Sequence, residues 1–262
     1  MKRVLWEEYM RSIIFCKRTI KELLRDPLSY VFCLGFPLVM LIMMTIVNQS
    51  IPEEAGMELF RIQSLAPGIA LFGLTFVMLF TCLQISKDRA GAFLTRLYAS
   101  PMNSFDFIGG YTIPLIIIAV LQIIIAFIAS IIIGRITGYE LQIMNVLLCI
   151  LVLLPSALMF IAFGLFFGTL LGEKSAPGIC SILITAASML GGIWMDVDAV
   201  GGTFRKVAHA LPFYHGTQAA RMALQGNYSE LGKSLLIIFL YAIAIYAIAA
   251  LLFQRKMQND LK

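Results

Sequence analysis

Apolar residues occur along this chain in runs of about twenty, separated by shorter polar segments. Six runs can be distinguished, with limits at 28–48, 65–86, 105–133, 142–171, 176–195 and 233–254. A bilayer core of about 30 Å needs roughly 20 apolar residues in one helix. Helices that are apolar on all sides are typical of membrane spans or of the interior of large proteins. The pattern therefore predicts an all-α membrane protein with six transmembrane helices.

The first 26 residues have a different pattern, in which apolar and basic positions recur at helical spacing. Trp6, Ile13 and Ile20 repeat along the segment, with Arg11 and Lys17 between them. This pattern predicts an amphipathic helix that lies on the anionic cytoplasmic surface of the membrane. The alternative is a solvated helix that packs on a partner protein. We therefore expect an interfacial helix at 1–26 and a six-span transmembrane domain at 27–262.

The charged residues are few and unevenly placed. Hydrophobic residues make up 60% of the chain and charged residues 13%, whereas soluble proteins carry about 25% charged residues. Fourteen of the twenty Lys and Arg residues lie in the N-terminal segment, at 86–104, at 172–175 or in the C-terminal tail. Such an excess marks the cytoplasmic side. We therefore expect a multi-pass protein of the cell inner (plasma) membrane with both termini in the cytoplasm.

The predicted outer segment at 195–232 is long but not polar throughout. Phe204, Leu211 and Phe213 are dispersed along it, and a disordered loop would be more polar. We expect short helices here that lie in, or dip into, the outer membrane interface.

The sequence contains no recognisable catalytic or metal-binding motif. It lacks the nucleophile elbow of α/β-hydrolases and the His-Glu-x-x-His zinc motif. His209 and His215 are the only histidines and have no third ligand at suitable spacing, so we assign no catalytic residue and no metal. The cores of the six predicted spans also lack ionisable residues, which ion-coupled transporters usually place at mid-membrane.

A second short amphipathic helix is expected at 86–102, on the cytoplasmic side. Ser86 is a candidate N-cap, the pair Phe93 and Leu97 gives one apolar face, and Pro101 would end the helix. The residues alone leave two interpretations open. The helix is either the contact with a soluble partner or a segment that rests on lipid headgroups.

The order of several segments resembles the permease of a type-2 ABC exporter. These are LAPGIALFGLTF opening the second span, KDRAGAFLTRLYASPM after it, EKSAPGICSILITAASMLGGIWM through the fifth, and LPFYHGTQAARMALQG before the last. The resemblance covers nearly the whole chain. It implies six spans, a cytoplasmic coupling helix, and re-entrant helices between spans 5 and 6.

The resemblance also implies partners and contact residues. It implies two permease chains, identical or homologous, and two cytoplasmic ATPase chains that hold ATP and Mg²⁺, with no cofactor bound by this chain. Thr95 departs from the family pattern, in which a Glu is frequent. The residues implied to contact the ATPase are Asp88, Arg89, Gly91, Phe93, Leu94, Arg96, Leu97 and Pro101.

The same resemblance places spans 2 and 5 at the seam between the two permeases. Phe72, Phe76 and Phe80 repeat every four residues and therefore share one helix face, which would otherwise be lipid-facing or core. The candidate pathway residues are Phe72, Phe76, Phe80, Thr185, Ser188 and Gly191. They suggest export of a hydrophobic or amphipathic cargo, such as a drug, an antimicrobial peptide or a lipid-linked molecule. The alternative is a secondary transporter or channel independent of ATP.

Overall fold

The computed structural model describes residues 2–51, 58–91 and 104–260, and within them every regular element is helical. This confirms the all-α prediction for the described part of the chain. In chain order the elements are α1 (Lys2–Leu24), α2 (Pro27–Tyr30), the π-helix η1 (Val31–Gly35), α3 (Phe36–Ser50), the 3₁₀ turn η3 (Glu58–Phe60), α4 (Ile62–Ala90), α6 (Ser104–Thr137), α7 (Ile143–Leu170), α8 (Ala176–Leu190), α9 (Val197–Val200), α10 (Gly202–Ala210), α11 (Pro212–Gln225) and α12 (Leu231–Asp260).

Five segments among the described residues are long and apolar enough to cross a membrane. They are Val31–Ser50, Ile62–Ala90, Asp106–Thr137, Ile143–Leu170 and Leu231–Lys256. The expected fifth span, 176–195, is shorter than predicted, because α8 has only 15 residues. It ends before Gly191, and Gly192 has a φ of +68° that a continuing right-handed helix does not allow.

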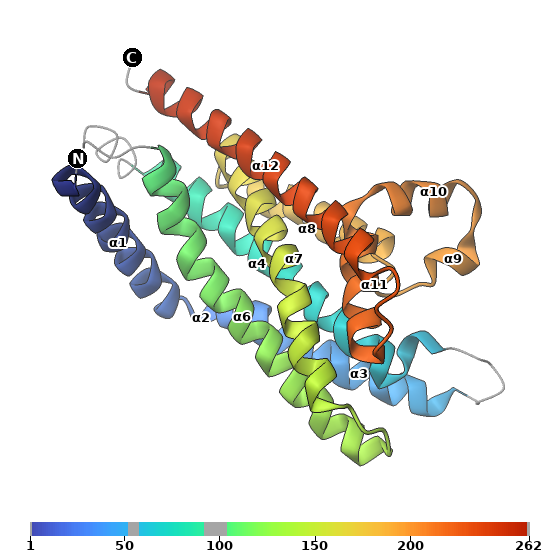
Figure 1. Ribbon diagram of the computed structural model, residues 1–262. Coiled ribbons are helices and arrows are strands. Elements are labelled where there is room, and N and C mark those ends of the chain that lie inside the picture. The colour runs from blue at the N-terminus through green and yellow to red at the C-terminus, as the bar shows by residue number, and fades with distance from the viewer. Residues whose placement is uncertain (1, 52–57, 92–103, 261–262) are drawn as a thin grey trace.

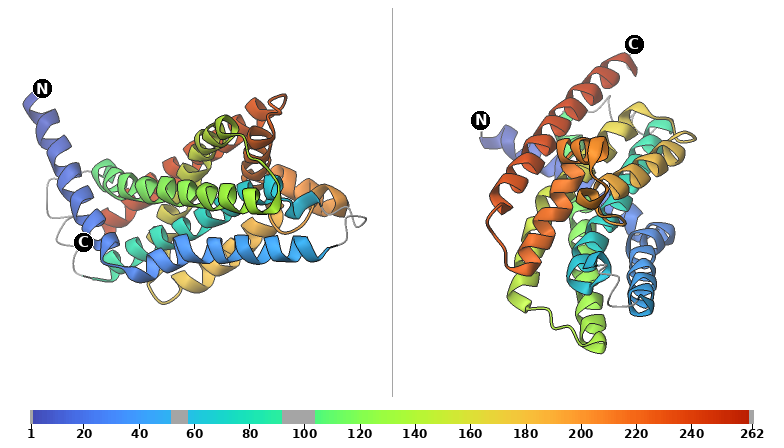
Figure 2. Two further views of the ribbon diagram at one scale, coloured as in Figure 1. Left: turned by 90° about the horizontal axis from the view of Figure 1, so that it is seen from below. Right: turned by 90° about the vertical axis from the view of Figure 1, so that its right-hand side faces the viewer.

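The long helices run side by side around α4, most of whose residues are buried (Figures 1 and 2). α4 packs against α7, α6, α8, α11 and α3. Both chain termini lie at one end of the bundle, which we call the terminus end (Figure 1). α9 and α10 lie at the opposite end, which we call the loop end.

The N-terminal helix α1 packs against α6 (Figure 1). The Phe15 ring lies edge-on to the rings of Phe107 and Tyr111, with centroids 5.5 and 4.9 Å apart. A Cβ atom at Gly110 would overlap the Phe15 ring, so the glycine permits the close approach of α1. α1 therefore contributes to the same hydrophobic core as the spans.

The first span is not a regular α-helix. The π-helix η1 precedes α3, and Pro37 lies in the first turn of α3. A proline ring clashes with the carbonyl group four residues earlier, here that of Cys33. Widening the turn to a π-helix is one way in which a helix relieves such a conflict, and π-turns are frequent at functional sites.

The segment between α8 and α12 forms the short helices that its apolar residues predict. α9 is capped by Asp196, whose Oδ1 accepts hydrogen bonds from the backbone N–H groups of Asp198 and Ala199 at 2.9 and 3.1 Å. α11 is largely buried and packs against α7, α12 and α4. α11 is therefore part of the bundle rather than a surface loop.

Candidate functional site

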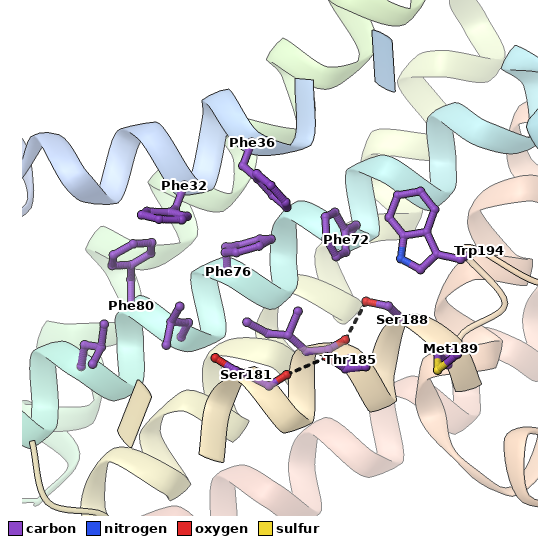
Figure 3. Close-up of a pocket in the computed structure, with 13 residues that line it drawn as sticks. Phe32, Phe36, Phe72, Phe76, Phe80, Ser181, Thr185, Ser188, Met189 and Trp194 are labelled. Atoms are coloured by element: carbon purple, nitrogen blue, oxygen red, sulfur yellow. Dashed lines mark hydrogen bonds between the residues drawn. The ribbon is translucent and has the colours of Figure 1, made fainter. Parts of the chain in front are cut away.

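An apolar pocket of about 580 Å³ lies between α4, α8 and the broken first span. Figure 3 shows aromatic side chains projecting into it from the first span and from α4, with hydroxyl-bearing residues of α8 opposite. The lining residues are Phe32, Phe36, Leu79, Leu83, Ser181, Ile184, Met189, Trp194, Phe72, Phe76, Phe80, Thr185 and Ser188. None of these residues is charged, so the pocket offers aromatic faces, aliphatic contact area and hydroxyl groups.

The aromatic rings form a connected cluster in which each ring orients its neighbours. Phe36 lies 5.4 Å from Phe76 and 5.9 Å from Phe72, measured between ring centroids. Phe72 in turn packs edge-on against Trp194 at 5.1 Å. Phe32 stacks on Phe76 at 6.3 Å. These distances lie in the range of favourable aromatic pairs, so the cluster holds a defined surface.

The opposite wall carries three hydroxyl groups of α8. The Thr185 hydroxyl donates to the Ser181 carbonyl oxygen at 3.0 Å, and the Ser188 hydroxyl donates to the Ile184 carbonyl oxygen at 2.6 Å (Figure 3). The Ser181 hydroxyl likewise donates to the Pro177 carbonyl oxygen. Each hydroxyl has thus used its proton within the helix and keeps only acceptor lone pairs. The pocket therefore suits an apolar or aromatic molecule that brings its own hydrogen-bond donors.

A second cluster joins α1 to α4 and α6. The Arg18 guanidinium donates hydrogen bonds of 3.0 and 3.2 Å to the two carboxylate oxygens of Asp88. The Tyr111 hydroxyl donates to the same carboxylate at 2.7 Å, and Gln84 bridges the Glu22 and Asp88 carboxylates. Asp88 is only 6% exposed. Burial alone would lower the pKa of the Arg18 guanidinium, but the hydrogen bonds and charge of Asp88 outweigh burial and raise that pKa.

Comparison with known proteins identifies the class of this membrane protein. The sequence matches the family model described as ABC-2 type transporter over residues 12–224. The chain belongs to the ABC-2 type transporter family. The matched range includes the second half of α1, the aromatic pocket and the Asp88 cluster. A comparison with curated proteins found no significant match.

The six pathway residues that the sequence suggested for this ABC-2 permease lie at two places in the structure. Phe72, Phe76, Phe80, Thr185 and Ser188 all line the aromatic pocket.

The sixth candidate, Gly191, does not line the pocket. It is the C-cap of α8. A Cβ atom there would approach the Phe213 carbonyl oxygen of α11 at 3.4 Å. Gly191 therefore lies at a tight helix junction rather than in the pocket wall.

Three aromatic residues of the pocket, Phe32, Phe36 and Trp194, were not predicted as site residues. Phe32 and Phe36 share one face of the first span because they are four residues apart, which is the same signal that marked the phenylalanines of span 2. Trp194 follows the end of α8. Only the packing of the first span and of the segment after α8 onto α4 brings these rings into the pocket.

The residues implied to contact the ATPase are only partly described. Phe93, Leu94, Arg96, Leu97 and Pro101 lie outside the described residues. Gly91 directly follows α4, at which it is the C-cap.

The predicted start of the coupling helix at Ser86 is wrong. α4 continues to Ala90, and Ser86 is buried within it and donates to the Leu83 carbonyl oxygen. The sequence suggested a separate helix beginning there, but Asp88 and Arg89 both belong to α4 and have partners within the permease.

Arg89 caps the C-terminal end of the neighbouring helix α7. Its guanidinium donates to the carbonyl oxygens of Gly168, Thr169 and Leu171 at or just past the end of α7. The last carbonyl groups of a helix lack intrahelical partners and carry partial negative charge. Arg89 therefore links the end of α4 to the end of α7, and its predicted ATPase contact stays a prediction.

The histidines do not form part of a metal site in the described part of the permease. No group of three or more His, Cys, Asp or Glu side chains there is placed to hold a metal ion. His209 instead contacts Asp198, and His215 contacts the His209 carbonyl oxygen.

Proposed function

We propose that this permease is the membrane subunit of an ATP-driven exporter that moves a hydrophobic or amphipathic substrate out of the cytoplasm. A drug, an antimicrobial peptide or a lipid-linked molecule would fit this class. Two separate cytoplasmic ATPase chains would bind and hydrolyse ATP with Mg²⁺. A second permease chain, identical or homologous, would complete the conduit, and this chain would be non-catalytic.

The aromatic pocket is the observation that carries this proposal. Its walls are aromatic and aliphatic apart from three hydroxyl groups, and none of its lining residues is charged. A small polar ion would lose its hydration there without gaining a counter-charge. An apolar or aromatic molecule would gain contact with several rings at once. The pocket volume of about 580 Å³ lies in the range of sites for drug-sized ligands.

The rim of this pocket supports a second permease chain as the other wall. Phe32, Phe36 and Met189 line the pocket and are also exposed, and Ile182 of α8 is exposed nearby in the sequence. Apolar residues on the edge of a pocket are suited to a facing chain or to lipid. A second copy that presents the same elements would enclose the pocket between two α4 and two α8 helices.

The proposed orientation follows from charge and from the position of the termini. The excess of Lys and Arg on the predicted inner side favours a cytoplasmic location for the terminus end. Five crossings would leave the termini at opposite ends, whereas both lie together in Figure 1. We therefore propose that α8 and the segment 191–195 make the sixth crossing. The loop end, with α9 and α10, would face outward.

The alternative is a secondary transporter or channel that works without ATP. A proton- or cation-coupled carrier usually holds an ionisable residue at its mid-membrane site. The lining of the aromatic pocket contains none. The family match also favours the ABC transporter.

The experiment uses inside-out proteoliposomes that contain the permease and its ATPase partner. Ethidium and a fluorescent NBD-labelled phospholipid serve as probes of an apolar cargo. We expect ATP to drive movement of at least one probe into the lumen or the lumenal leaflet, and a protonophore to leave this movement intact. Movement driven by a pH gradient in the absence of ATP would contradict the proposal and support the alternative.

A further inference from the structure

A second pocket of about 750 Å³ lies at the loop end, and it differs from the aromatic pocket in carrying charge. It is formed by the residues before and at the start of α4, the segment after α8, and α11. Leu59, Phe60 and Trp194 give it an apolar side, and Arg221, Asp196 and Asp198 give it a polar one. A pocket with both kinds of wall fits an amphipathic ligand.

Arg221 is the basic group of this pocket and is only 8% exposed. Its Nε donates to the Ser64 carbonyl oxygen at 3.1 Å, and its Nη2 donates to the Gly192 carbonyl oxygen at 2.8 Å. Within the described residues, no carboxylate lies within 4.0 Å of this guanidinium. Burial lowers the pKa of Arg221 to about 10, which leaves it positively charged at neutral pH.

A buried guanidinium held only by carbonyl groups is an unusual arrangement. Removing a charge from water is costly unless a counter-charge compensates for it. The planar guanidinium also has five N–H donors in a fork that matches phosphate oxygens. The two bonds from Nε and Nη2 leave Nη1 without a hydrogen-bond partner among the described residues. Since Arg221 lines the pocket, the pocket is the place from which an anion would reach Nη1.

The two acidic residues of the pocket differ in how many ion-pair and hydrogen-bond partners they already have. Asp198 is paired with Arg205 at 2.8 Å and accepts a hydrogen bond from the Tyr214 hydroxyl at 2.7 Å. Asp196 is exposed and uses only Oδ1, as the cap of α9. Its Oδ2 has no hydrogen-bond partner within the part of the chain that the structure describes. Asp196 is therefore the acidic group available to a cationic ligand group.

We propose that this pocket binds the headgroup of a zwitterionic phospholipid that carries an ammonium group, as phosphatidylethanolamine does. The phosphate contacts Arg221, the ammonium contacts Asp196, and the glycerol and first acyl carbons lie along Leu59 and Phe60. A soluble anion such as inorganic phosphate would match Arg221 but would leave the apolar side empty and would be repelled by Asp196. The amphipathic lining thus favours a lipid. The inference concerns a lipid site and does not depend on the direction or energy source of transport.

The test measures lipid binding to the purified, delipidated permease by native mass spectrometry. Phosphatidylethanolamine is compared with phosphatidylglycerol of the same acyl chains and with soluble phosphoethanolamine. The variants are Arg221→Lys, which keeps the charge but loses the fork, and Asp196→Asn, which keeps a good helix cap. Lys206→Gln removes a neighbouring exposed charge that does not line the pocket and serves as the control.

We expect phosphatidylethanolamine to bind about two- to fivefold more tightly than phosphatidylglycerol, because an exposed ammonium–carboxylate pair contributes modestly. Asp196→Asn should abolish this preference. Arg221→Lys should weaken binding of both lipids by about tenfold, because it removes hydrogen bonds to a charged group.

Three results would overturn the proposal. If the wild type, like Asp196→Asn, bound phosphatidylethanolamine and phosphatidylglycerol equally, the ammonium contact would be excluded. Unchanged lipid binding by Arg221→Lys would show that Arg221 only ties Ser64 to Gly192. Phosphoethanolamine binding as tightly as the lipid would point to a soluble phosphomonoester instead. If Arg221→Lys fails to fold, Asp196→Asn still decides the question, because it leaves both carbonyl contacts of Arg221 in place.

Discussion

Arg18 and Asp88 lie seventy positions apart in the sequence, and the structure joins them by two hydrogen bonds between α1 and the last turn of α4. Asp88 is also the first of the residues that the family resemblance implies to contact the ATPase. Because Tyr111 and Gln84 hold the same carboxylate, the end of α4, α1 and α6 are tied together at one point. A displacement of the proposed coupling segment would therefore move α1 with the spans.

Asp88→Asn should destabilise the permease, because it removes the buried carboxylate charge that accepts two Arg18 hydrogen bonds and leaves Arg18 with the more exposed Glu22, 2.7 Å away. We expect a cost of about 1–3 kcal/mol, which corresponds to a decrease in Tm of about 2–4 °C per kcal/mol. Arg18→Gln combined with Asp88→Asn should recover part of the loss, as coupled residues do in a double-mutant cycle. Lys87→Gln, at an exposed neighbouring position, is the control. Additive effects of the two changes in thermal unfolding would contradict the pairing.

The sequence predicted most of the helices, because the length of each apolar run sets the length of its helix. The predicted helix ends were wrong at two places, where side-chain hydrogen bonds or a positive backbone φ determine the end of the helix. A new helix was expected to begin at Ser86, but α4 continues because Arg18 and the carbonyl groups at the end of α7 satisfy Asp88 and Arg89. The apolar run through 195 suggested a full span, but α8 ends before the glycine pair at 191–192.

The aromatic pocket was predictable only in part. Four-residue spacing marked Phe72, Phe76 and Phe80 as one face of a helix, and that face does line the pocket. Phe32 and Phe36 have the same four-residue spacing, but no local pattern indicates that they and Trp194 meet that face, because their positions depend on the π-helix of the first span and on the turn after α8. The Arg221 pocket was not anticipated, because its carbonyl partners at 64 and 192 are set by tertiary packing.

The proposed coupling segment can be tested through Leu97, which lies outside the described residues. Leu97→Asp should place a charge on the apolar face that Phe93 and Leu97 share in the predicted helix. We expect co-purification of the ATPase to fall several-fold while permease abundance stays constant. Thr95→Asp, on the opposite face of that helix, is the matched control. Normal ATPase association of Leu97→Asp would show that the contact lies elsewhere.

The orientation can be tested with single cysteines in a variant that lacks the five natural cysteines. Thr203→Cys in α10 and Lys174→Cys between α7 and α8 lie on opposite sides in the proposed topology. A membrane-impermeant maleimide applied to intact cells should label Thr203→Cys, and should label Lys174→Cys only after permeabilisation. Labelling of Lys174→Cys in intact cells would reverse or refute the orientation.

Protonation of His215, a buried residue of α11, should lower the stability of the folded permease at mildly acidic pH. Burial lowers the pKa of His215, outweighing its hydrogen bond to the His209 carbonyl oxygen, while the charges of His209 and Lys233 lower it further. A histidine with a lowered folded-state pKa binds fewer protons when folded, so stability falls as the pH drops below its ordinary pKa of about 6.5.

Between about pH 7.5 and about pH 5.5, Tm should therefore fall by about 2–4 °C more for the wild type than for His215→Gln. Lys206→Gln, which removes an exposed charge that is not among those acting on His215, is the control. An identical pH profile for the wild type and His215→Gln would contradict this role of the buried ring.

The central claim is that the aromatic pocket between α4 and α8 carries an apolar cargo in ATP-driven transport. The most direct measurement is probe movement in the ATPase-containing vesicles for Phe76→Ala and for Phe239→Ala. Phe76 contacts both Phe32 and Phe36 in the pocket, whereas Phe239 lies on α12 with 51% of its surface exposed. We predict that Phe76→Ala lowers the rate of ATP-dependent probe movement by about fivefold or more, because about 1 kcal/mol or more of aromatic contact is lost. Assembly of the Phe76→Ala complex and the transport rate of Phe239→Ala should match the wild type. Wild-type movement by Phe76→Ala would contradict the account.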